Sequence, residues 1–432
     1  MFNRLILQLL IVAASILTYN IYFDYMEPKY NYLGFSFFDG HYYSVLFNSI
    51  VVSFFVWLMP SKIRYPSDVF SIFSYMFVVI PSFSVPLYTT FNLPLDQYYL
   101  MLFFMSILLA LSAFLGRSEN FLYSKFLLFR YQKIASYVLW VFTAFSFALV
   151  VFSYGFNIQK IFSLKDLSEL YEIRDDFRSV NKGGAVFSAY FLPWLSKVII
   201  PFFFAKYILE KKYMYALYAF FAQFILFGTS GQKSIFLSLI VVYAIIKLLS
   251  SKDSGIKTLY LFMSFIVLSY GAYYILNFDF VADNIVRRSF IVPGLLTGYY
   301  VEFYSQNPLD GYSLTNSLGV TIDNNIPAAF EIGTHYMGRS DLSANANIYA
   351  SAFSHFRLYG VAFEGLLLLI YLYILNLSVY RKSDKILCCC IATTPLLALN
   401  DSAFLTVMVT HGAILTFLII TFVVKDKEII FK

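Results

Sequence analysis

Residues 5–23 read LILQLLIVAASILTYNIYF, a run of nineteen residues without a charged side chain. About 20 apolar residues in a helix cross a hydrocarbon core roughly 30 Å thick, so this run predicts a membrane span. Arg4 precedes the run and Ala13-Ala14-Ser15 lies inside it, a pattern that a cleaved signal peptide also shows. Because the apolar stretch continues well past that tripeptide, we expect an uncleaved signal anchor.

Similar runs recur along the whole chain of 432 residues. Hydrophobic residues make up 60% of the chain and charged residues 13%, whereas soluble domains are about half apolar and about a quarter charged. The runs are about twice as long as a barrel strand requires, which favours helices. We therefore predict an all-α polytopic integral membrane protein, one domain over 1–432, with about twelve spans. The predicted spans lie near 5–23, 42–60, 69–88, 98–116, 135–154, 186–208, 213–228, 234–250, 258–276, 360–380, 386–400 and 403–424.

The distribution of lysine and arginine predicts the orientation. If the N-terminus lies in the cytoplasm, every inside segment carries a basic residue, and the inside segments together hold eighteen of the 31. Cytoplasmic segments are enriched in Lys and Arg, so both termini are expected in the cytoplasm. The net charge of +6 gives no reason to expect nucleic acid as a partner. The inside residues are Arg4, Lys62, Arg64, Arg117, Lys125, Arg130, Lys133, Lys211, Lys212, Lys247, Lys252, Lys257, Arg381, Lys382, Lys385, Lys425, Lys427 and Lys432.

Two of the predicted outer segments are long, residues 155–185 and residues 277–359. In the first, apolar residues recur every three to four positions among charged ones, which predicts a helix lying on the membrane–water interface. These apolar residues are Ile158, Ile161, Leu164, Leu167, Leu170, Ile173 and Phe177.

The second outer segment contains the apolar stretch SFIVPGLLTGYYVEFY (289–304). A full crossing there would move the basic residues that follow span ten to the outside, against the charge rule. Pro293, Gly294 and Gly298 are also expected to break the stretch. We therefore predict a re-entrant or interfacial element. Residues 346–360 are expected to form a helix that leads into span ten.

The stretch FGTSGQKS (227–234) has some residues of a phosphate-binding loop. Such a loop needs two glycines with four residues between them, followed directly by Lys and then Ser or Thr, on a turn between a strand and a helix. Here Gln232 separates Gly231 from Lys233, and both flanks are predicted spans, so we reject a nucleotide site. Lys233 lies at the outer N-terminus of span eight, where a helix favours anions. It is expected either to contact a lipid diphosphate beside Arg287 and Arg288, or to extend to the interface as an ordinary lysine.

Several arginines lie in the two long outer segments, and guanidinium groups suit phosphate. We predict that they bind a diphosphate near the bilayer, the alternative being ion pairs with neighbouring acids such as Asp279 and Asp283. The basic residues that cluster in these segments include Arg174, Arg178, Lys182, Arg287, Arg288, Arg339 and Arg357.

Glu302 and His335 are the candidates for a general base, which a glycosyl transfer needs to accept the proton of the acceptor hydroxyl. The sequence has no metal-ligand spacing, and the consecutive Cys388, Cys389 and Cys390 cannot form a metal site or a disulfide framework. These cysteines are interpreted as small apolar residues within a helix. No metal and no cofactor is expected.

Four stretches resemble bacterial O-antigen (oligosaccharide repeat unit) polymerases: YEIRDDFR (171–178), LFGTSGQKSIFLSLIVV (226–242), RRSFIVPGLLTGYYVEFYSQNPL (287–309) and NDSAFLTVMVTHG (400–412). Like this chain, members of that family have many spans and two long outer segments. The family also has motifs of the form R-x10-G in its two long periplasmic segments. Arg287 and Gly298 match that spacing, whereas Arg174 and Gly184 have nine residues between them. The resemblance makes Gly298 a candidate for substrate binding, beside the arginines.

The resemblance implies a membrane glycosyltransferase at the periplasmic face of the bacterial inner membrane. Such an enzyme transfers the growing glycan from undecaprenyl diphosphate to a hydroxyl of the next lipid-linked repeat unit. It implies the undecaprenyl-diphosphate-linked oligosaccharide and the bilayer as partners, with a chain-length regulator and a flippase as protein partners.

Two alternatives remain open from the sequence. An O-antigen ligase, which transfers the finished glycan to lipid A core, carries a histidine and arginines in an outer loop, and SHFRLYG (354–360) fits that description. A flippase for the lipid-linked sugar would be a transporter with about two more spans and an internal repeat. The two long outer segments favour an enzyme over a transporter.

Overall fold

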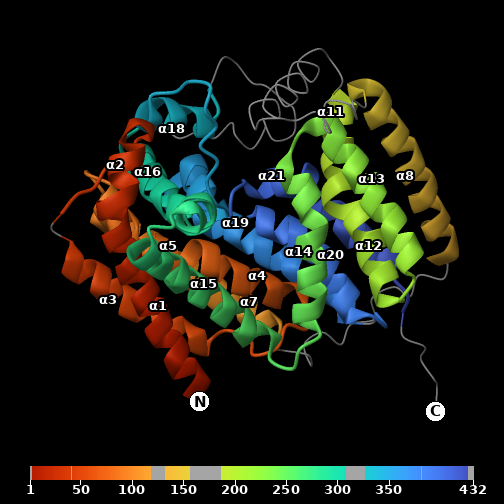
Figure 1. Cartoon of the computed structure of the whole chain (residues 1–432), viewed down its shortest axis with the longest axis horizontal. Helices are drawn as coiled ribbons and strands as arrows, with labels where there is room; N and C mark the ends of the chain where they lie inside the picture. The colour runs from red at the N-terminus through yellow and green to blue at the C-terminus, as the bar shows by residue number, and fades with distance from the viewer. Residues whose placement is uncertain are drawn as a thin grey trace. The chain divides into compact units, whose positions relative to one another are not determined.

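The computed structural model describes residues 2–39, 41–117, 132–155, 186–307, 326–380 and 382–426. Within these ranges the regular structure is helical and contains no strand; an isolated β-bridge joins Lys382 and Asp426 (Figure 1). Seven of the described helices are long and apolar enough to cross a membrane. The chain therefore has the all-α character of a helical membrane protein.

The seven candidate spans each overlap one of the predicted spans. They are Asn3–Leu33, Pro66–Ser84, Leu95–Leu115, Gln132–Ser153, Tyr190–Leu209, Ser254–Leu276 and Ile348–Tyr380. Four shorter apolar helices fall in other predicted spans: Tyr42–Trp57, Ile235–Leu249, Lys385–Ala398 and Ala413–Phe422. The predicted span 403–424 is two helices, α21 (Phe404–Val409) and α22 (Ala413–Phe422), separated where Gly412 has φ 80°.

The described chain groups into two compact units. Unit 1 comprises Met1–Phe121, Lys252–Asn376 and Leu396–Thr406, and unit 2 comprises Leu122–Ser251, Leu377–Pro395 and Val407–Lys432. Each unit is assembled from segments that are far apart in the sequence, so neither corresponds to a continuous stretch of chain. One domain over 1–432 stays a prediction.

Unit 1 is built around a buried helical segment. Its helices are α1 (Phe2–Ile21), η1 (Tyr22–Met26), α2 (Glu27–Tyr30), η2 (Asn31–Leu33), α3 (Tyr42–Ser53), η3 (Phe54–Trp57), α4 (Pro66–Ser74), η4 (Tyr75–Val79), α5 (Ile80–Ser84), α6 (Pro86–Thr89), α7 (Leu95–Leu115), α15 (Ser254–Leu276), η7 (Ala282–Ile291), α16 (Val292–Gln306), α18 (Ala328–Met337) and most of α19 (Ile348–Tyr380). Nearly every residue from α4 to α6 is buried.

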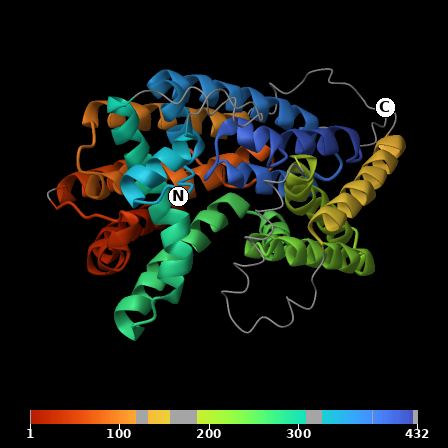
Figure 2. The ribbon, with the colours of Figure 1, turned by 90° about the horizontal axis from the view of Figure 1, so that it is seen from above.

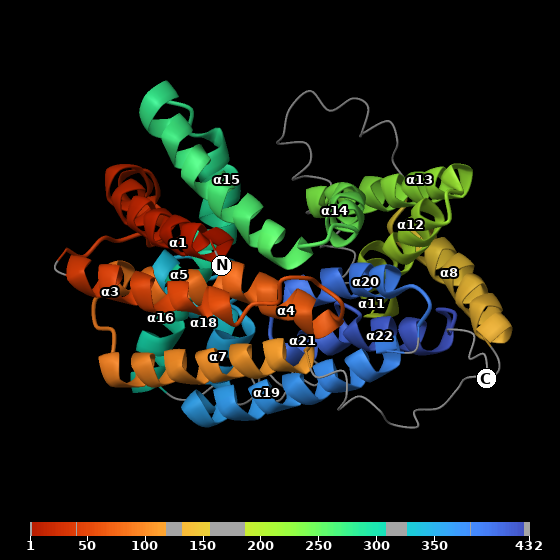
Figure 3. The ribbon, with the colours of Figure 1, turned by 90° about the horizontal axis from the view of Figure 1, so that it is seen from below.

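Small polar side chains join this central segment to its neighbours. Ser71 Oγ of α4 lies 2.8 Å from Ser112 Oγ of α7, and Ser82 Oγ of α5 lies 3.0 Å from Thr297 Oγ1 of α16. Hydrogen bonds between membrane helices contribute about 0.6 kcal/mol each on average. Figures 2 and 3 show α7 and α19 running alongside one another, where Gly365 of α19 approaches Leu108 of α7.

The stretch 289–304 is not broken as the sequence led us to expect. The π-helix η7 and the α-helix α16 are continuous, because Val292 at the junction keeps right-handed helical φ and ψ. A Cβ at Gly294 would lie 2.8 Å from the Pro81 carbonyl oxygen, and one at Gly298 would lie 2.2 Å from Thr90 Oγ1. The glycines therefore allow close packing of two helices, and the expected break at Pro293, Gly294 and Gly298 is wrong.

A turn of π-helix before each of four prolines explains why these helices continue past the proline. The π-helices η1, η4, η6 (Leu195–Ile199) and η7 each end two residues before a proline: Pro28, Pro81, Pro201 and Pro293. Proline lacks an N–H, and its ring clashes with the carbonyl four residues earlier. A preceding turn of π-helix widens the spacing of the carbonyls and so accommodates the ring without a break.

The helix expected to lead into span ten begins at Ile348 and bends near Phe356. Asn347 caps it, because Asn347 Oδ1 accepts backbone N–H groups of Tyr349 and Ala350 at 3.1 Å each. At the kink, Phe356 has φ −145° and ψ 28°, and Arg357 has φ 53° and ψ −137°. Positive φ is costly for a residue with a side chain, so the kink is a strained position.

Unit 2 contains the remaining helices. They are α8 (Gln132–Tyr154), α11 (Val186–Trp194), η6, α12 (Ile200–Leu209), α13 (Tyr213–Ser230), α14 (Lys233–Leu249), α22 and parts of α20 (Lys385–Ala398) and α21. The buried Gln223 of α13 donates from Nε2 to Ser196 O and Ile235 O, both at 2.9 Å, and so joins three helices. The three consecutive cysteines are buried in α20 without a disulfide, as predicted.

Candidate functional site

Arg287 lies in η7 and is held by an acid, as the alternative interpretation of the sequence predicts. Its Nε donates to Asp283 Oδ1 at 3.0 Å and to the Asp283 carbonyl oxygen at 3.1 Å. Its guanidinium carbon lies 4.1 Å from the ring centroid of Tyr30, within range of a cation–π interaction. Among the described residues, the two terminal nitrogens of Arg287 have no hydrogen-bond partner.

The same network ties η7 to the segment that follows the first helix. Lys29 Nζ lies 3.3 Å from Asp279 Oδ2 and 3.2 Å from Asp283 Oδ2. Tyr25 donates to Asp279 Oδ2 at 2.5 Å, and Tyr30 donates to Asp283 Oδ1. These contacts bring together residues about 250 positions apart in the chain.

The network lowers the pKa of both aspartates. Hydrogen bonds from Tyr25 and Lys29 hold the pKa of Asp279 below its ordinary value. Burial by itself raises the pKa of Asp283, but hydrogen bonds from Tyr30 and Lys29 and the charge of Arg287 outweigh burial, so that pKa is also lowered. Both carboxylates therefore stay charged at neutral pH.

Arg288 is exposed, unlike Arg287, so the two neighbouring arginines are in different environments. The continuous helix η7–α16 also separates Arg287 from Glu302, because fifteen residues correspond to roughly 20 Å along a helix axis. The arginine pair and Glu302 therefore do not meet at one point, although both lie in the second long outer segment.

Gly298, the last residue of the R-x10-G spacing, is buried against α6. A Cβ there would lie 2.2 Å from Thr90 Oγ1 and 3.0 Å from Pro86 Cβ. Thr90 Oγ1 is itself buried and has no hydrogen-bond partner among the described residues. The geometry gives Gly298 a packing role, and its candidacy for substrate binding stays a prediction.

Glu302 is half-buried near the C-terminal end of α16 and joins two other segments. Its Oε1 accepts the backbone N–H of Asn92 at 2.8 Å, and its Oε2 accepts the hydroxyl of Tyr336 at 2.9 Å. Burial, followed by the charge of Glu302 and this hydrogen bond, raises the pKa of Tyr336. The Tyr336 hydroxyl therefore stays protonated and donates to the carboxylate.

His335 is exposed on α18 beside the same tyrosine. Its ring centroid lies 4.8 Å from that of Tyr336 and 5.2 Å from that of Phe303, both edge to face. Tyr336 stacks on Tyr299 with centroids 4.1 Å apart and planes 4° apart. The structure thus brings the two predicted bases, Glu302 and His335, to the same aromatic cluster.

Arg339 follows α18 and forms an exposed ion pair. Its Nη2 lies 2.7 Å from Asp341 Oδ2, and its Nε lies 3.2 Å from Asp341 Oδ1. Its backbone N–H donates to the carbonyl of Gly333 at 3.1 Å, which helps to end α18. Arg339 is therefore close in the chain to His335, and its side chain is engaged by an acid.

The other predicted site residues are not part of this cluster. Lys233 is the first residue of α14 in unit 2, as expected for the N-terminus of span eight. Its expected proximity to Arg287 concerns a residue of unit 1 and stays a prediction. Arg174 and Arg178 lie outside the described residues, as does nearly all of the predicted interfacial helix.

Sequence reasoning missed a buried pair at the kink of α19. His355 Nδ1 lies 2.5 Å from Glu364 Oε1, and both side chains are almost fully buried. His355 Nε2 is buried with no hydrogen-bond partner among the described residues. Arg357 is half-buried and donates from Nε to the carbonyl of Tyr304 at 2.9 Å. The polar pattern of SHFRLYG was visible in the sequence, but the burial of its histidine was not.

Sequence reasoning also passed over the segment after the first helix, 24–39. This segment supplies Lys29 and Tyr30 to the Arg287 network and Gly34 to the aromatic cluster, since the Tyr299 hydroxyl donates to the Gly34 carbonyl. Its signal in the sequence is a concentration of acids and aromatic rings in DYMEPKYNYLGFSFFD.

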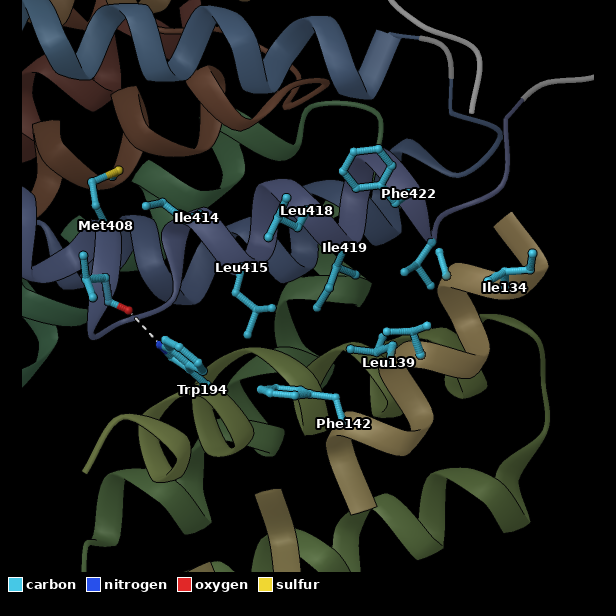
Figure 4. Close-up of a pocket in the computed structure, with 14 residues that line it drawn as sticks. Ile134, Leu139, Phe142, Trp194, Met408, Ile414, Leu415, Leu418, Ile419 and Phe422 are labelled. Carbon is cyan, nitrogen blue, oxygen red and sulfur yellow. Dashed lines mark hydrogen bonds between the residues drawn. The ribbon is translucent and has the colours of Figure 1, made fainter. Parts of the chain in front are cut away.

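Unit 2 contains an apolar groove of about 650 Å³ between α8, α11 and α22. Figure 4 shows Leu139 and Phe142 of α8 facing Leu415 and Ile419 of α22 across it. Trp194 closes one end, where its Nε1 donates to the Val409 carbonyl at 2.7 Å. The walls can accept hydrocarbon but present almost no polar group for chemistry.

The described residues as a whole offer acid–base groups without a metal site. No group of three His, Cys, Asp or Glu side chains in the described ranges is placed to hold a metal ion. The cluster around Tyr336 offers a half-buried carboxylate and an exposed imidazole, which can accept a proton from a hydroxyl group. Comparison of the chain with known proteins finds no matching family model, no matching curated protein and no matching solved structure.

Proposed function

We propose that the chain polymerises lipid-linked O-antigen repeat units at the periplasmic face of the bacterial inner membrane. The observation that carries the proposal is the cluster on α16 and α18, where Glu302 and His335 both contact Tyr336. Further support comes from the resemblance of four stretches to the polymerase family and from the membrane character of the helices. The proposal includes twelve spans with both termini in the cytoplasm.

The charges of unit 1 support this orientation. At one end, Arg4 donates to the Trp57 carbonyl at 2.8 Å, and Arg117 donates to the Leu58 carbonyl at 2.6 Å. Lys62 and Arg64 line a cavity of about 270 Å³ there with Arg117. Basic residues gather in this way on the cytoplasmic side of a membrane protein.

The other end of the same helices is acidic. Asp24 follows α1 and accepts the hydroxyl of Tyr274, which lies near the end of α15. Asp279 and Asp283 lie just beyond α15. Because α1 begins at the basic end and runs toward the acidic one, the segment after α1 lies at the acidic end. Tyr299 donates to the Gly34 carbonyl in that segment and stacks on Tyr336, which donates to Glu302, so we assign the cluster around Glu302 to the periplasmic side.

In the proposed reaction the acceptor hydroxyl oxygen attacks the anomeric carbon of the donor glycan. The bond from that carbon to the diphosphate oxygen breaks, and undecaprenyl diphosphate leaves with the bonding electrons. Glu302 accepts the hydroxyl proton, since its carboxylate is half-buried and held by Asn92 and Tyr336. His335, exposed beside Tyr336, orients the acceptor hydroxyl. We also propose a chain-length regulator and a flippase as candidate protein partners.

The test is the lipopolysaccharide profile of a strain that lacks the chain. We expect lipid A core to carry a single repeat unit, restored to long polymer by the wild-type chain. Uncapped core beside long lipid-linked polymer would identify a ligase, and repeat units retained on the cytoplasmic side would identify a flippase. The ligase alternative relies on the histidine of residues 354–360, and that histidine is buried against Glu364, so we favour the polymerase.

A further inference from the structure

A cavity of about 430 Å³ opens at the acidic end of unit 1. It lies between the end of α1, the segment after it and α15, which Figure 3 shows beside α1. Its volume falls within the range of about 300–1,000 Å³ that is typical of small-molecule sites. The lining residues are Tyr19, Asn20, Phe23, Asp24, Phe37, Asp39 and Tyr274.

Two carboxylates in this lining are held by tyrosine hydroxyls. Asp24 Oδ2 accepts from Tyr274 at 2.8 Å, and Asp39 Oδ1 accepts from Tyr19 at 3.3 Å. Asp24 Oδ1 has no hydrogen-bond partner among the described residues. An ionised carboxylate offers about four acceptor positions, so a ligand rich in hydroxyl groups can donate to these acids.

Aromatic rings form the rest of the wall. Phe23 is 55% exposed, and its ring centroid lies 4.9 Å from that of Phe37. Tyr19 meets Phe37 edge to face at 5.3 Å. An exposed ring at a span end usually contacts lipid, but Phe23 here lies between Asn20 and Asp24, two polar residues of the same cavity.

The negative charge of the lining favours a neutral ligand over a phosphate-containing one. It contains two acids and no Lys or Arg, so a phosphate or diphosphate group would be repelled. A neutral saccharide suits both parts of the wall, because its hydroxyl groups donate to carboxylates and the C–H face of its ring packs against an aromatic ring.

We propose that this cavity, which we call the α1–α15 cavity, binds a pyranose unit of a saccharide between Phe23 and the carboxylates of Asp24 and Asp39. The choice of a saccharide rests on the proposed function. Under that function, the cavity holds a sugar of the repeat unit away from the reacting hydroxyl, and it thereby contributes to the selection of the repeat unit.

The test measures binding with the full-length protein in phospholipid nanodiscs, since maltoside detergents carry the same chemistry as the ligand. Saturation-transfer NMR with N-acetylglucosamine, D-galactose and L-rhamnose as separate probes reports which protons contact the protein. We expect transfer to the ring C–H protons of at least one probe. Asp24→Asn and Phe23→Ala should each weaken this binding about tenfold or more, because a hydrogen bond to a charged group or a ring contact is lost.

Phe103→Ala is the matched control. Phe103 lies in α7 of the same unit, is 59% exposed and does not line the cavity, so its loss should leave binding unchanged. No transfer to any of the three probes in the wild type, or equal transfer in Phe23→Ala and wild type, would overturn the proposal. Displacement of the saccharide signal by millimolar Ca²⁺, with transfer that survives Phe23→Ala, would mark the acids as a cation site and would also overturn it.

The same variants separate this proposal from the proposed function. If binding is lost in Phe23→Ala but the strain without the chain still makes full-length polymer, the cavity stands and the polymerase proposal fails. If that strain makes single repeat units but Phe23→Ala and Asp24→Asn bind normally, the polymerase proposal stands and the cavity proposal fails.

Discussion

Replacement of Gly298 by alanine tests whether the R-x10-G glycine serves packing or substrate binding. An ideal Cβ at Gly298 would lie 2.2 Å from Thr90 Oγ1 and 3.0 Å from Pro86 Cβ, so α16 must move away from α6 by about 1 Å to restore ordinary contact. Adding a methyl group to a tightly packed interior costs about 1–3 kcal/mol. Alanine also favours a helix over glycine by about 0.5–1 kcal/mol, which offsets part of that cost.

Gly271→Ala provides the matched control. Gly271 lies within α15 of the same unit, and a Cβ there would meet nothing within 4 Å. This variant should gain the helix preference without the clash. The difference between the two variants therefore isolates the packing cost, and we expect Gly298→Ala to be less stable than Gly271→Ala by about 1–3 kcal/mol. SDS-induced unfolding of the purified protein, followed by circular dichroism, measures both free energies.

Thr90→Ala supplies the second step of the test. Thr90 Oγ1 has no hydrogen-bond partner among the described residues, so its removal costs no bond and opens the space that a Cβ at Gly298 needs. We expect the double variant to recover most of the lost stability, with a coupling energy of about 1–2 kcal/mol. Polymer length in cells should fall with Gly298→Ala and recover with Thr90→Ala.

Two results would refute the packing argument. One is equal stability of Gly298→Ala and Gly271→Ala. The other is loss of polymer in a Gly298→Ala protein of normal stability, without rescue by Thr90→Ala. The second result would return Gly298 to the substrate-binding role that the resemblance implies.

Three further predictions concern the cluster, the kink and the acid network. Glu302→Gln keeps one acceptor oxygen for the backbone N–H of Asn92, and its NH2 group can donate to the Tyr336 hydroxyl in place of the present bond. The variant lacks the base, so we expect polymer to be lost while thermal stability changes by less than about 1 kcal/mol; normal polymer would exclude Glu302 as the base. Arg357→Gly relieves the positive φ of 53° that Arg357→Ala retains, so thermal unfolding should show the glycine variant more stable by about 1 kcal/mol, and the reverse order would argue against strain. The pKa values of Asp279 and Asp283 are lowered in the folded protein. The two ionised carboxylates therefore contribute fully to stability above the ordinary aspartate pKa of about 4. That contribution is lost as the pH falls through the lowered pKa values of the folded protein. Unfolding temperatures measured from pH 7 to 3 should therefore drop below about pH 4, and the drop should shrink when both are changed to Asn.

The long apolar helices were predictable because hydropathy acts locally. Each of the seven candidate spans overlaps a run read from the sequence. The break expected at Pro293, Gly294 and Gly298 failed for a physical reason. Glycine and proline end helices where the backbone can bond to water or where a turn is available, whereas here the glycines allow contact with α5 and α6 and the proline follows a π-helix.

The site was less predictable because its contacts are distant in sequence. Arg287 was expected either to bind phosphate or to pair with Asp283, and the pairing occurs at helical spacing, which a sequence reveals. The contacts of Lys29 and Tyr30 with Asp283 cross about 250 residues, and no periodicity encodes them. The burial of His355 could not be foreseen either, since its partner Glu364 lies nine residues further along the chain, beyond the kink at Phe356 and Arg357.

The continuous helix formed by η7 and α16 also determines which arginine can stabilise the leaving diphosphate in the proposed reaction. A general base and the groups that stabilise a leaving diphosphate must act on one anomeric carbon, and Arg287 lies roughly 20 Å along the helix from Glu302. Arg339 and Arg357 are nearer the cluster: Arg339 follows α18, and Arg357 Nε donates to the carbonyl of Tyr304, two residues from Glu302. Arg339 is exposed and paired with Asp341, whereas Arg357 is half-buried, and its strained backbone is a feature that proteins retain mostly at functional positions. We therefore expect Arg357, rather than Arg287, to contact the diphosphate beside Glu302.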